Sequence, residues 1–231
     1  MAGRKEPLTT GEYYHVYNRG VDRRVLFRDK KDYGRFLMQL YAFNDFEIAS
    51  NYAYYAALGF EALREREREE PLVGVVAFCL MPNHYHLVLR QLRDDGISLY
   101  MQKAGAGYAK YFNLKYERTG ALFESRFKAK CVDDDSYLYQ IVPYVHANPL
   151  GISAKIDSSK RDFRVGTRAL EKYTWSSYPV YLGRYGEGDV QYDVLDHRLI
   201  QELGLPVGRT HLQQIQKYLS SPEDDRNHGW D

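Results

Sequence analysis

The stretch LVGVVAFCLMPNHYHLVLR, residues 72–90, decides the fold because it contains two strand-like runs joined by a turn. Residues 72–80 form an apolar run rich in β-branched side chains, and residues 84–90 alternate between two faces. Met81-Pro82-Asn83 between the runs favours a short connection. The stretch therefore predicts an antiparallel hairpin. One face of its second strand carries His84, His86 and Val88, and the other carries Tyr85, Leu87 and Leu89.

The same signals, followed outward from the hairpin, predict one α+β unit. Further strands are expected at residues 13–20 and 126–132. Helices are expected after the N-cap candidate Asp29, over about 98–115, and from the Asp133–Ser136 cap to about Asn148. The order β, α, β, β, α, β and then a helix predicts a ferredoxin-like (βαββαβ) antiparallel sheet with helices on one face, followed by a C-terminal helical extension. The open face of such a sheet can take a ligand.

The predicted organisation is a main domain over residues 1–150 and a second segment over 151–231. The charged stretch at 46–70 is expected to be a solvated helical insertion that could cover a binding face or a dimer interface. The second segment begins with a basic, polar linker at 154–168. It continues with TWSSYPVYL (174–182) and two short helical patterns near 194–204 and 209–219. The last ten residues are expected to be disordered.

Composition narrows the class of protein. The chain has 231 residues, 44% of them hydrophobic, which is enough for one full core and an appendage. Its longest apolar stretch, Val73 to Met81, is far shorter than the roughly 18 residues of a membrane span. Two cysteines, Cys79 and Cys131, lie in strand-like runs and suggest buried thiols, with neither a disulfide framework nor a thiolate metal site. We expect a cytoplasmic protein without membrane contacts.

The charge distribution indicates a partner more clearly than the net charge of +1 does. Bases outnumber acids within residues 18–35 and 103–130, where several of the 22 tyrosines also lie. Cations interleaved with aromatic rings suit single-stranded nucleic acid, although tyrosine also simply fills strands and helix faces. The candidate phosphate contacts are Arg19, Arg23, Arg24, Lys110, Arg118, Arg126 and Lys128.

Two short motifs carry the chemistry. His84 and His86 lie two residues apart in a strand, so both imidazoles can converge on one ion, although such a pair is equally compatible with structural histidines. The second motif is YVHANP (144–149), in which Tyr144 and Asn148 share one face of a helix. The amide oxygen of Asn148 can complete a two-histidine site. Such imidazole and oxygen ligands suit Mg²⁺ or Mn²⁺ better than a tightly bound structural zinc.

A tyrosine beside such a site favours phosphodiester chemistry. Attack by a tyrosinate on phosphorus gives a covalent intermediate, and a metal polarises the phosphate. Tyr137 and Tyr139 lie on the same predicted helix and are rival nucleophiles. Pro143 is expected to kink that helix beside Tyr144. We favour structural roles for His15 and His146, although His15 could approach the site across the sheet.

These motifs resemble the REP-associated tyrosine transposases, within the insertion-sequence 200-like HUH group of single-strand DNA transposases. The resemblance spans roughly residues 12–182. It is carried by YHVYNRGVDRRVLF (14–27), AFCLMPNHYHLVL (77–89), YFNLKYERTGALFESRFKAK (111–130), YLYQIVPYVHANPL (137–150) and WSSYPVYL (175–182), in that order.

The resemblance implies that His84 and His86 bind a divalent metal, that Tyr144 is the nucleophile, and that Asn148 is the third metal ligand. It implies nicking and joining of single-stranded or hairpin DNA through a 5′-phosphotyrosine, by a monomer or a homodimer. Two other classes remain open: a regulator that binds nucleic acid without chemistry on the same fold, and a metal hydrolase that activates water.

Overall fold

The computed structural model describes residues 7–46, 52, 57–65, 70–132, 134–151 and 163–221. Its centre is a four-stranded sheet made of β1 (Tyr13–Arg19), β2 (Val73–Met81), β3 (His84–Gln91) and β4 (Lys128–Val132). The strands lie in the order β2-β3-β1-β4, and every neighbouring pair is antiparallel. This order, with the last strand of the unit beside the first, confirms the predicted ferredoxin-like sheet.

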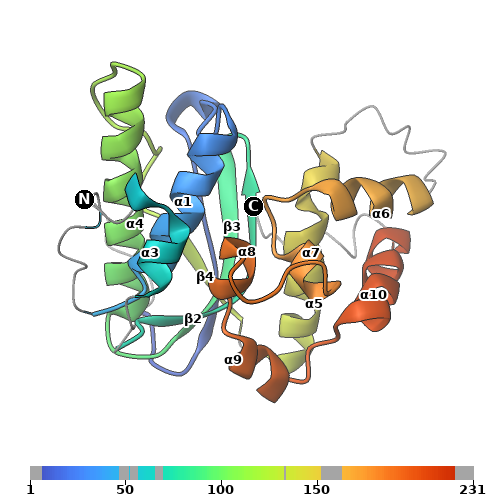
Figure 1. Ribbon diagram of the computed structural model, residues 1–231. Coiled ribbons are helices and arrows are strands. Elements are labelled where there is room, and N and C mark those ends of the chain that lie inside the picture. The colour runs from blue at the N-terminus through green and yellow to red at the C-terminus, as the bar shows by residue number, and fades with distance from the viewer. Residues whose placement is uncertain are drawn as a thin grey trace.

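Helices cover both faces of this sheet (Figure 1). Helices α1 (Lys30–Ala42) and α4 (Gly96–Lys115) pack against each other on one face, as predicted. Helix α5 (Asp135–Ala147) packs on β2, β3 and β4 from the other face and continues into the 3-10 turn η2 (Asn148–Gly151). The face predicted to be open to a ligand therefore carries α5, and any ligand must lie between that helix and the strands.

The sequence of β2 reflects this layered arrangement. All nine residues of VGVVAFCLM are buried, because the strand has helices on both faces. A strand covered on both sides has no reason to alternate with polar residues, which explains the continuous apolar run. The outer edge of β2 is also paired, since the amide of Leu80 donates to the carbonyl of Trp175 (2.8 Å) and the amide of Ser177 donates to that of Phe78 (2.9 Å).

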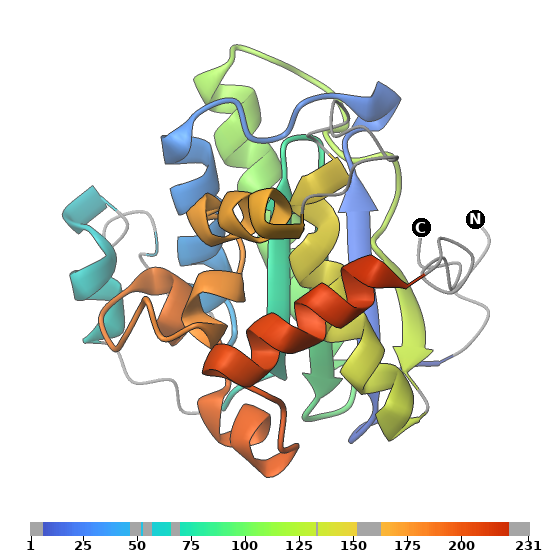
Figure 2. The same cartoon turned by 90° about the vertical axis from the view of Figure 1, so that its right-hand side faces the viewer.

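The C-terminal segment adds a further set of helices. It comprises α6 (Phe163–Lys172), α7 (Tyr178–Tyr181), α8 (Val190–Asp193), α9 (His197–Glu202) and α10 (Gly208–Ser220). Of these, α6, α7 and α10 pack together beside α5, while α9 packs on β2 and α8 reaches α1 on the other face. A second apolar cluster, formed by Ala147, Leu170, Tyr178, Ile215 and Leu219, joins α6, α7 and α10 to the end of α5. Figure 2 looks onto these helices, with α10 running across α5.

The predicted linker at 154–168 needs a correction in its second half. Helix α6 begins at Phe163, and its Thr167 and Leu170 are buried. The many charges in this stretch conceal the spacing of the few residues that face the protein. The first half of the linker, to residue 162, and the last ten residues of the chain, 222–231, lie outside the described residues.

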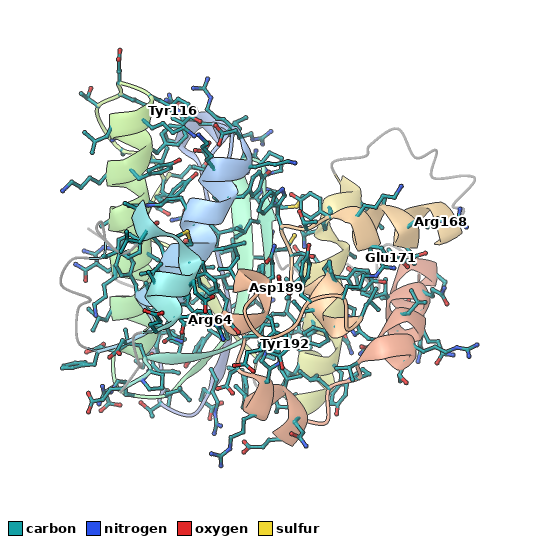
Figure 3. The ribbon with its side chains drawn as sticks, in the orientation of Figure 1. Arg64, Tyr116, Arg168, Glu171, Asp189 and Tyr192 are labelled. Atoms are coloured by element: carbon teal, nitrogen blue, oxygen red, sulfur yellow. The ribbon has the colours of Figure 1, made fainter. Side chains whose placement is uncertain are left out.

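The insertion contains a short helix, α3 (Phe60–Arg64), among its described residues. Phe60 packs edge-on against Tyr41 of α1, with ring centroids 5.1 Å apart. Arg64, labelled in Figure 3, forms an ion pair with Asp193 of α8 (2.6 Å). The described part of the insertion therefore connects α1 to the C-terminal helices. Most of residues 47–56 and 66–69 lie outside the described part.

Two expectations from composition can be compared with the fold. Within the described residues, every helix is too short or too polar to cross a membrane. Cys79 is buried in β2 and Cys131 is half-buried in β4, and the two form no disulfide with each other.

Candidate active site

The histidine pair lies on the face of the sheet that α5 covers. His84 and His86 have ring centroids 5.0 Å apart and nearly perpendicular planes. Tyr85 between them points to the other face, where it packs on Phe36 of α1. The alternation predicted from the sequence is therefore confirmed, and it directs both imidazoles toward α5.

The partner of His84 fixes which ring nitrogen carries the proton. Its Nδ1 lies 2.7 Å from Oδ1 of Asn83, while Nδ2 of Asn83 donates to the carbonyl of Arg23 (3.4 Å). Because an amide oxygen only accepts, Nδ1 of His84 must donate. In the neutral ring Nε2 then has its lone pair available for a cation.

Nδ1 of His86 also contacts a neighbouring side chain, in this case in the protein interior. This Nδ1 lies 2.9 Å from Nε2 of His15, and the two rings stack with centroids 5.1 Å apart. Nε2 of His86 is buried and has no hydrogen-bond partner among the residues that the structure describes. The tautomer in which His86 donates from Nδ1 leaves this Nε2 as an unsatisfied acceptor, which is the state that a metal ligand requires.

Burial keeps these rings uncharged. It holds the pKa of His86 well below its usual range, with smaller contributions from His15 and His84. Burial, followed by the nearby charge of Lys130, lowers the pKa of His15 to about 3. Both rings are therefore neutral at pH 7, because an imidazole charges only below its pKa.

Tyr144 lies directly over the histidines. Its half-buried ring makes edge contacts with both His86 and His15, each at a centroid distance of 5.7 Å. It projects from α5 one residue after Pro143, which lies inside the helix. The helix nevertheless continues through the proline and carries the phenol to the sheet.

Asn148 lies at the point where α5 changes into η2. Its Nδ2 donates to the carbonyl of Tyr144 (3.0 Å), which leaves its Oδ1 as the acceptor that can serve an outside ligand. Asn148 lines the same open cavity as His84 and His86. The described residues contain no group of three His, Cys, Asp or Glu side chains that could hold a metal. The amide oxygen of Asn148 is therefore the candidate for a third protein ligand.

The cavity has a volume of about 760 Å³ and opens where β1 ends and β3 begins. Its apolar lining comes from Val25, Met81 and Pro82, and its polar lining also includes Tyr17, Asn18, Arg19, Arg23, Asn83, Glu124 and Lys128. It is large enough for a small organic ligand. Chemically, the cavity combines neutral nitrogen and oxygen donors with cations at the rim.

The residues predicted to contact phosphate differ in their distance from the cavity. Arg19, Arg23 and Lys128 line the cavity, but Arg19 already forms two bonds with Glu124 (3.0 and 3.1 Å). Arg24 adjoins Arg23, and Arg126 is exposed in the segment before β4.

The remaining two contacts lie elsewhere. Arg118 uses its guanidinium to hold the loop after α4, donating to Ala121 (2.6 Å) and Asn113 (2.9 Å). Lys110 is exposed on α4, in the helix layer on the other face of the sheet.

The segment that presents Arg23 has an unusual backbone. Asp22 and Arg23 both have positive φ, of 54° and 55°, which L residues seldom adopt. At Gly20 a Cβ would clash with the carbonyl of Arg24, so only glycine allows the chain to turn here. Backbone strain of this kind tends to gather at ligand sites.

The other candidate side chains lie elsewhere on α5. The hydroxyl of Tyr139 donates to the carbonyl of Leu203 (2.9 Å), toward α9, and Tyr137 lies near Lys130 of β4. His146 is fully buried and bonds His211 (2.8 Å) on the side facing α10. Among the three candidate tyrosines, Tyr144 is the one whose ring packs on His86.

Sequence reasoning gave His15 and Asn83 less weight than their positions justify. His15 was expected to be structural, yet it bonds His86 directly. Strand alternation places His15 and Tyr17 on one face of β1, but only the register, with Tyr17 opposite His86, brings that face to the histidine pair. Asn83 was interpreted as a turn residue, and its contact with His84 depends on the shape of the turn.

Comparisons with known proteins can now be set beside this geometry. No family model matches the chain, and no curated protein matches it. Among solved structures, the chain is similar to a REP-associated tyrosine transposase bound to a REP hairpin, with a TM-score of 0.51 and 14% sequence identity. The match covers 82% of this chain and 93% of the other. At this identity the likeness is one of fold. The protein is thus defined as a ferredoxin-like α+β protein of the architecture found in that transposase.

Proposed function

We propose that this protein is a metal-dependent single-stranded DNA endonuclease and strand transferase that acts on hairpin DNA. The observation that carries the proposal is the contact of Tyr144 with His86, at 5.7 Å between ring centroids, beside a cavity that His84 and Asn148 share. A candidate nucleophile thus packs on a histidine whose nitrogen donors, with the oxygen of Asn148, line one opening. Such a constellation suits phosphoryl transfer.

In the proposed cleavage, the phenol of Tyr144 loses its proton and its oxygen attacks a phosphodiester. The bond from the tyrosine oxygen to phosphorus forms as the bond from phosphorus to the 3′ oxygen breaks. The 3′ oxygen takes up a proton and leaves as a hydroxyl, so the 5′ phosphate stays on the tyrosine. Attack by a 3′ hydroxyl on this linkage reverses the step, joins two strands and restores Tyr144.

The donor set fits a divalent cation such as Mg²⁺ or Mn²⁺. His84 and His86 would hold it through Nε2, and Asn148 through Oδ1. The buried Nε2 of His86 without a hydrogen-bond partner among the described residues supports this fit. When bound, the cation would polarise the phosphate and stabilise the charge that develops on it. His15 keeps the ring of His86 in its orientation.

The substrate class follows from the rim of the cavity and from the solved neighbour. Arg23 and Lys128 provide positive charge at the opening, and the apolar Val25 and Pro82 could accept the face of a base. The neighbour was bound to a REP hairpin, which supports folded single-stranded DNA as the substrate.

A covalent trap tests the proposal. Labelled hairpin DNA with single-stranded flanks, incubated with the protein and Mn²⁺, should give a protein–DNA adduct on a denaturing gel. Tyr144→Phe should abolish the adduct, whereas Tyr139→Phe should retain it, because the Tyr139 hydroxyl bonds backbone carbonyls at 203 and 204. An adduct that survives Tyr144→Phe would reject the nucleophile.

The two other classes give different results in the same assay. A regulator without chemistry would bind the hairpin equally well with and without metal, would tolerate His84→Ala, and would never cleave. A hydrolase that activates water would cleave in Tyr144→Phe and leave no DNA on the protein.

A further inference from the structure

Pro143 leaves one carbonyl of α5 without its usual partner. Proline has no N–H, so the carbonyl of Tyr139, four residues earlier, cannot receive the helical hydrogen bond. A side chain from the C-terminal segment supplies the missing donor, because Nε2 of Gln214 in α10 lies 2.8 Å from the Tyr139 oxygen. The open carbonyl in α5 is therefore capped by a side chain of a helix that begins more than sixty residues further along the chain.

This cap fixes the direction of a buried hydrogen-bond chain. Since Nε2 of Gln214 is the donor, its Oε1 accepts, and Nδ1 of His211 (3.2 Å) must donate to it. Neutral His211 can then only accept at Nε2, so Nδ1 of His146 donates there (2.8 Å). Both rings are neutral, because burial holds the pKa of His146 well below its usual range and lowers the pKa of His211 to about 4.

The chain ends on the sheet. Nε2 of His146 lies 2.7 Å from the hydroxyl of Ser177 and, as the remaining acceptor, receives its proton. The Ser177 oxygen in turn accepts from the amide of Phe78 in β2 (2.9 Å). Each group has one consistent role, donor or acceptor, from β2 to the carbonyl of Tyr139. Buried networks that are satisfied throughout fix the parts that they connect.

We propose that α10 is a positioning element for Tyr144, with Gln214 as the residue that holds the turn of α5 that contains Pro143. This inference rests on the proposed function. Tyr144 follows Pro143 directly, so the turn that Gln214 caps is the turn that aims the phenol. Apolar packing of Ile215 and Leu219 against the end of α5 holds α10 in place, as the crossing of the two helices in Figure 2 illustrates.

Gln214→Glu tests the cap with little change in shape. A carboxylate still accepts from His211 but cannot donate to the Tyr139 carbonyl. The exposed neighbour Gln213→Glu is the matched control, since it adds the same charge one residue away. We expect Gln214→Glu to slow single-turnover adduct formation about 10- to 100-fold, with hairpin and Mn²⁺ affinities nearly unchanged. Equal adduct rates in the two variants would overturn the inference.

A double-mutant cycle separates capping from general loss of stability. Pro143→Ala restores an N–H that can bond the Tyr139 carbonyl within the helix, which makes the Gln214 donor redundant. In this background Gln214→Glu should change the adduct rate less than about twofold relative to Pro143→Ala alone. A loss as large as in the wild-type background would refute the capping role.

Hydrogen exchange distinguishes failure of this inference from failure of the proposed function. If the wild-type protein forms no adduct, the proposed function fails, yet the stabilisation of α5 by Gln214 can still be measured. The amides of residues 144–147 should then exchange faster in Gln214→Glu than in Gln213→Glu. Equal exchange in the two variants would show that α10 does not hold this turn.

Discussion

At the scale of single residues, three imidazoles meet where the sequence motif contains two. His15 stacks on His86 and bonds its Nδ1, and His84 is oriented by Asn83. Asn83 leaves Nε2 of His84 as the unprotonated nitrogen, and His15 does the same for His86 in the tautomer in which His86 donates from Nδ1. Partners of this kind fix the orientation and tautomer of metal-binding histidines.

Replacing His15 tests this arrangement without removing a ligand. His15→Phe keeps an aromatic ring in the stack but loses the nitrogen that faces His86. We expect Mn²⁺ affinity, measured by calorimetry or electron paramagnetic resonance, to fall about 10- to 100-fold. His197→Phe, at a histidine of α9 that bonds the carbonyl of Tyr192, should leave it unchanged. Unaltered affinity in His15→Phe would mean that His86 needs no partner.

The sequence predicted the placement of the candidate residues on strand and helix faces better than their contacts. Alternation along a strand is a local property, so it placed His84 and His86 on one face correctly. Helical spacing likewise placed Tyr144 and Asn148 together. The contact between His15 and His86 depends on the pairing of strands 71 residues apart, and no local pattern specifies that register.

At the scale of elements, the start of α1 shows how local signals and distant partners combine. Asp29 and Asp32 form a reciprocal capping box. The side chain of Asp32 is also fully buried, where it receives hydrogen bonds from Lys115 (2.7 Å) and Tyr116 (2.8 Å) of the α4 end. Burial tends to raise the pKa of Asp32, but these bonds outweigh it and the pKa lies below its ordinary value. One carboxylate therefore caps α1 and ties it to α4.

Removing this carboxylate should be costly. Asp32→Ala is expected to lower the free energy of unfolding by about 2–4 kcal/mol, through loss of the cap and of a largely buried ion pair. Urea denaturation measures the change. Lys115→Ala breaks the same pair, so the losses in the double variant should be clearly less than additive. Full additivity would indicate that the two side chains act independently.

Elements with strong periodicity were predicted closely, whereas the polar helix α6 was not. The helix expected over about 98–115 is Gly96–Lys115, and the pattern near 209–219 is α10. Helix α6 was missed, because it lies in a charged stretch and buries only a narrow face against η2, α7 and α10. The bond from Gln214 that caps α5 could not be predicted either, since it joins two distant helices.

At the scale of the whole molecule, buried neutral histidines make stability depend on pH. In the unfolded chain His146 and His211 titrate near 6.5, whereas in the folded protein burial holds the pKa of both lower, at about 4 for His211. Between these values the unfolded chain binds protons that the folded chain does not. The free energy of unfolding is therefore highest above about pH 6.5 and falls as the pH drops toward 4.

Each such histidine contributes a slope of up to about 1.4 kcal/mol per pH unit within this window. In His211→Gln the slope of unfolding free energy against pH, from denaturant titrations, should decrease by up to that amount. Part of the slope should remain in this variant, because burial also lowers the pKa values of His15 and His86. An identical slope in His211→Gln and the wild type would contradict this account.

The charge at the cavity makes a second prediction for the molecule as a whole. If Lys128 contacts a phosphate, Lys128→Ala should weaken hairpin binding and reduce the slope of log affinity against log salt by about 0.7 to 1. Lys110→Ala, on the far helix layer, is the matched control and should leave the slope unchanged. Fluorescence anisotropy over a salt series measures both. A larger loss of hairpin affinity in Lys110→Ala than in Lys128→Ala would indicate that the DNA binds over α4 instead.

The pairing of Trp175 and Ser177 with β2 has a consequence for self-association. β2 is nine residues long, apolar and the outermost strand on its side of the sheet, and the segment at 175–177 occupies part of its backbone edge. The opposite border strand, β4, carries Lys128 and Lys130, and charged lysines discourage docking of further strands. We therefore expect a chain that lacks everything after residue 150 to expose the edge of β2 and to aggregate more readily than the full chain, which sedimentation of both would measure.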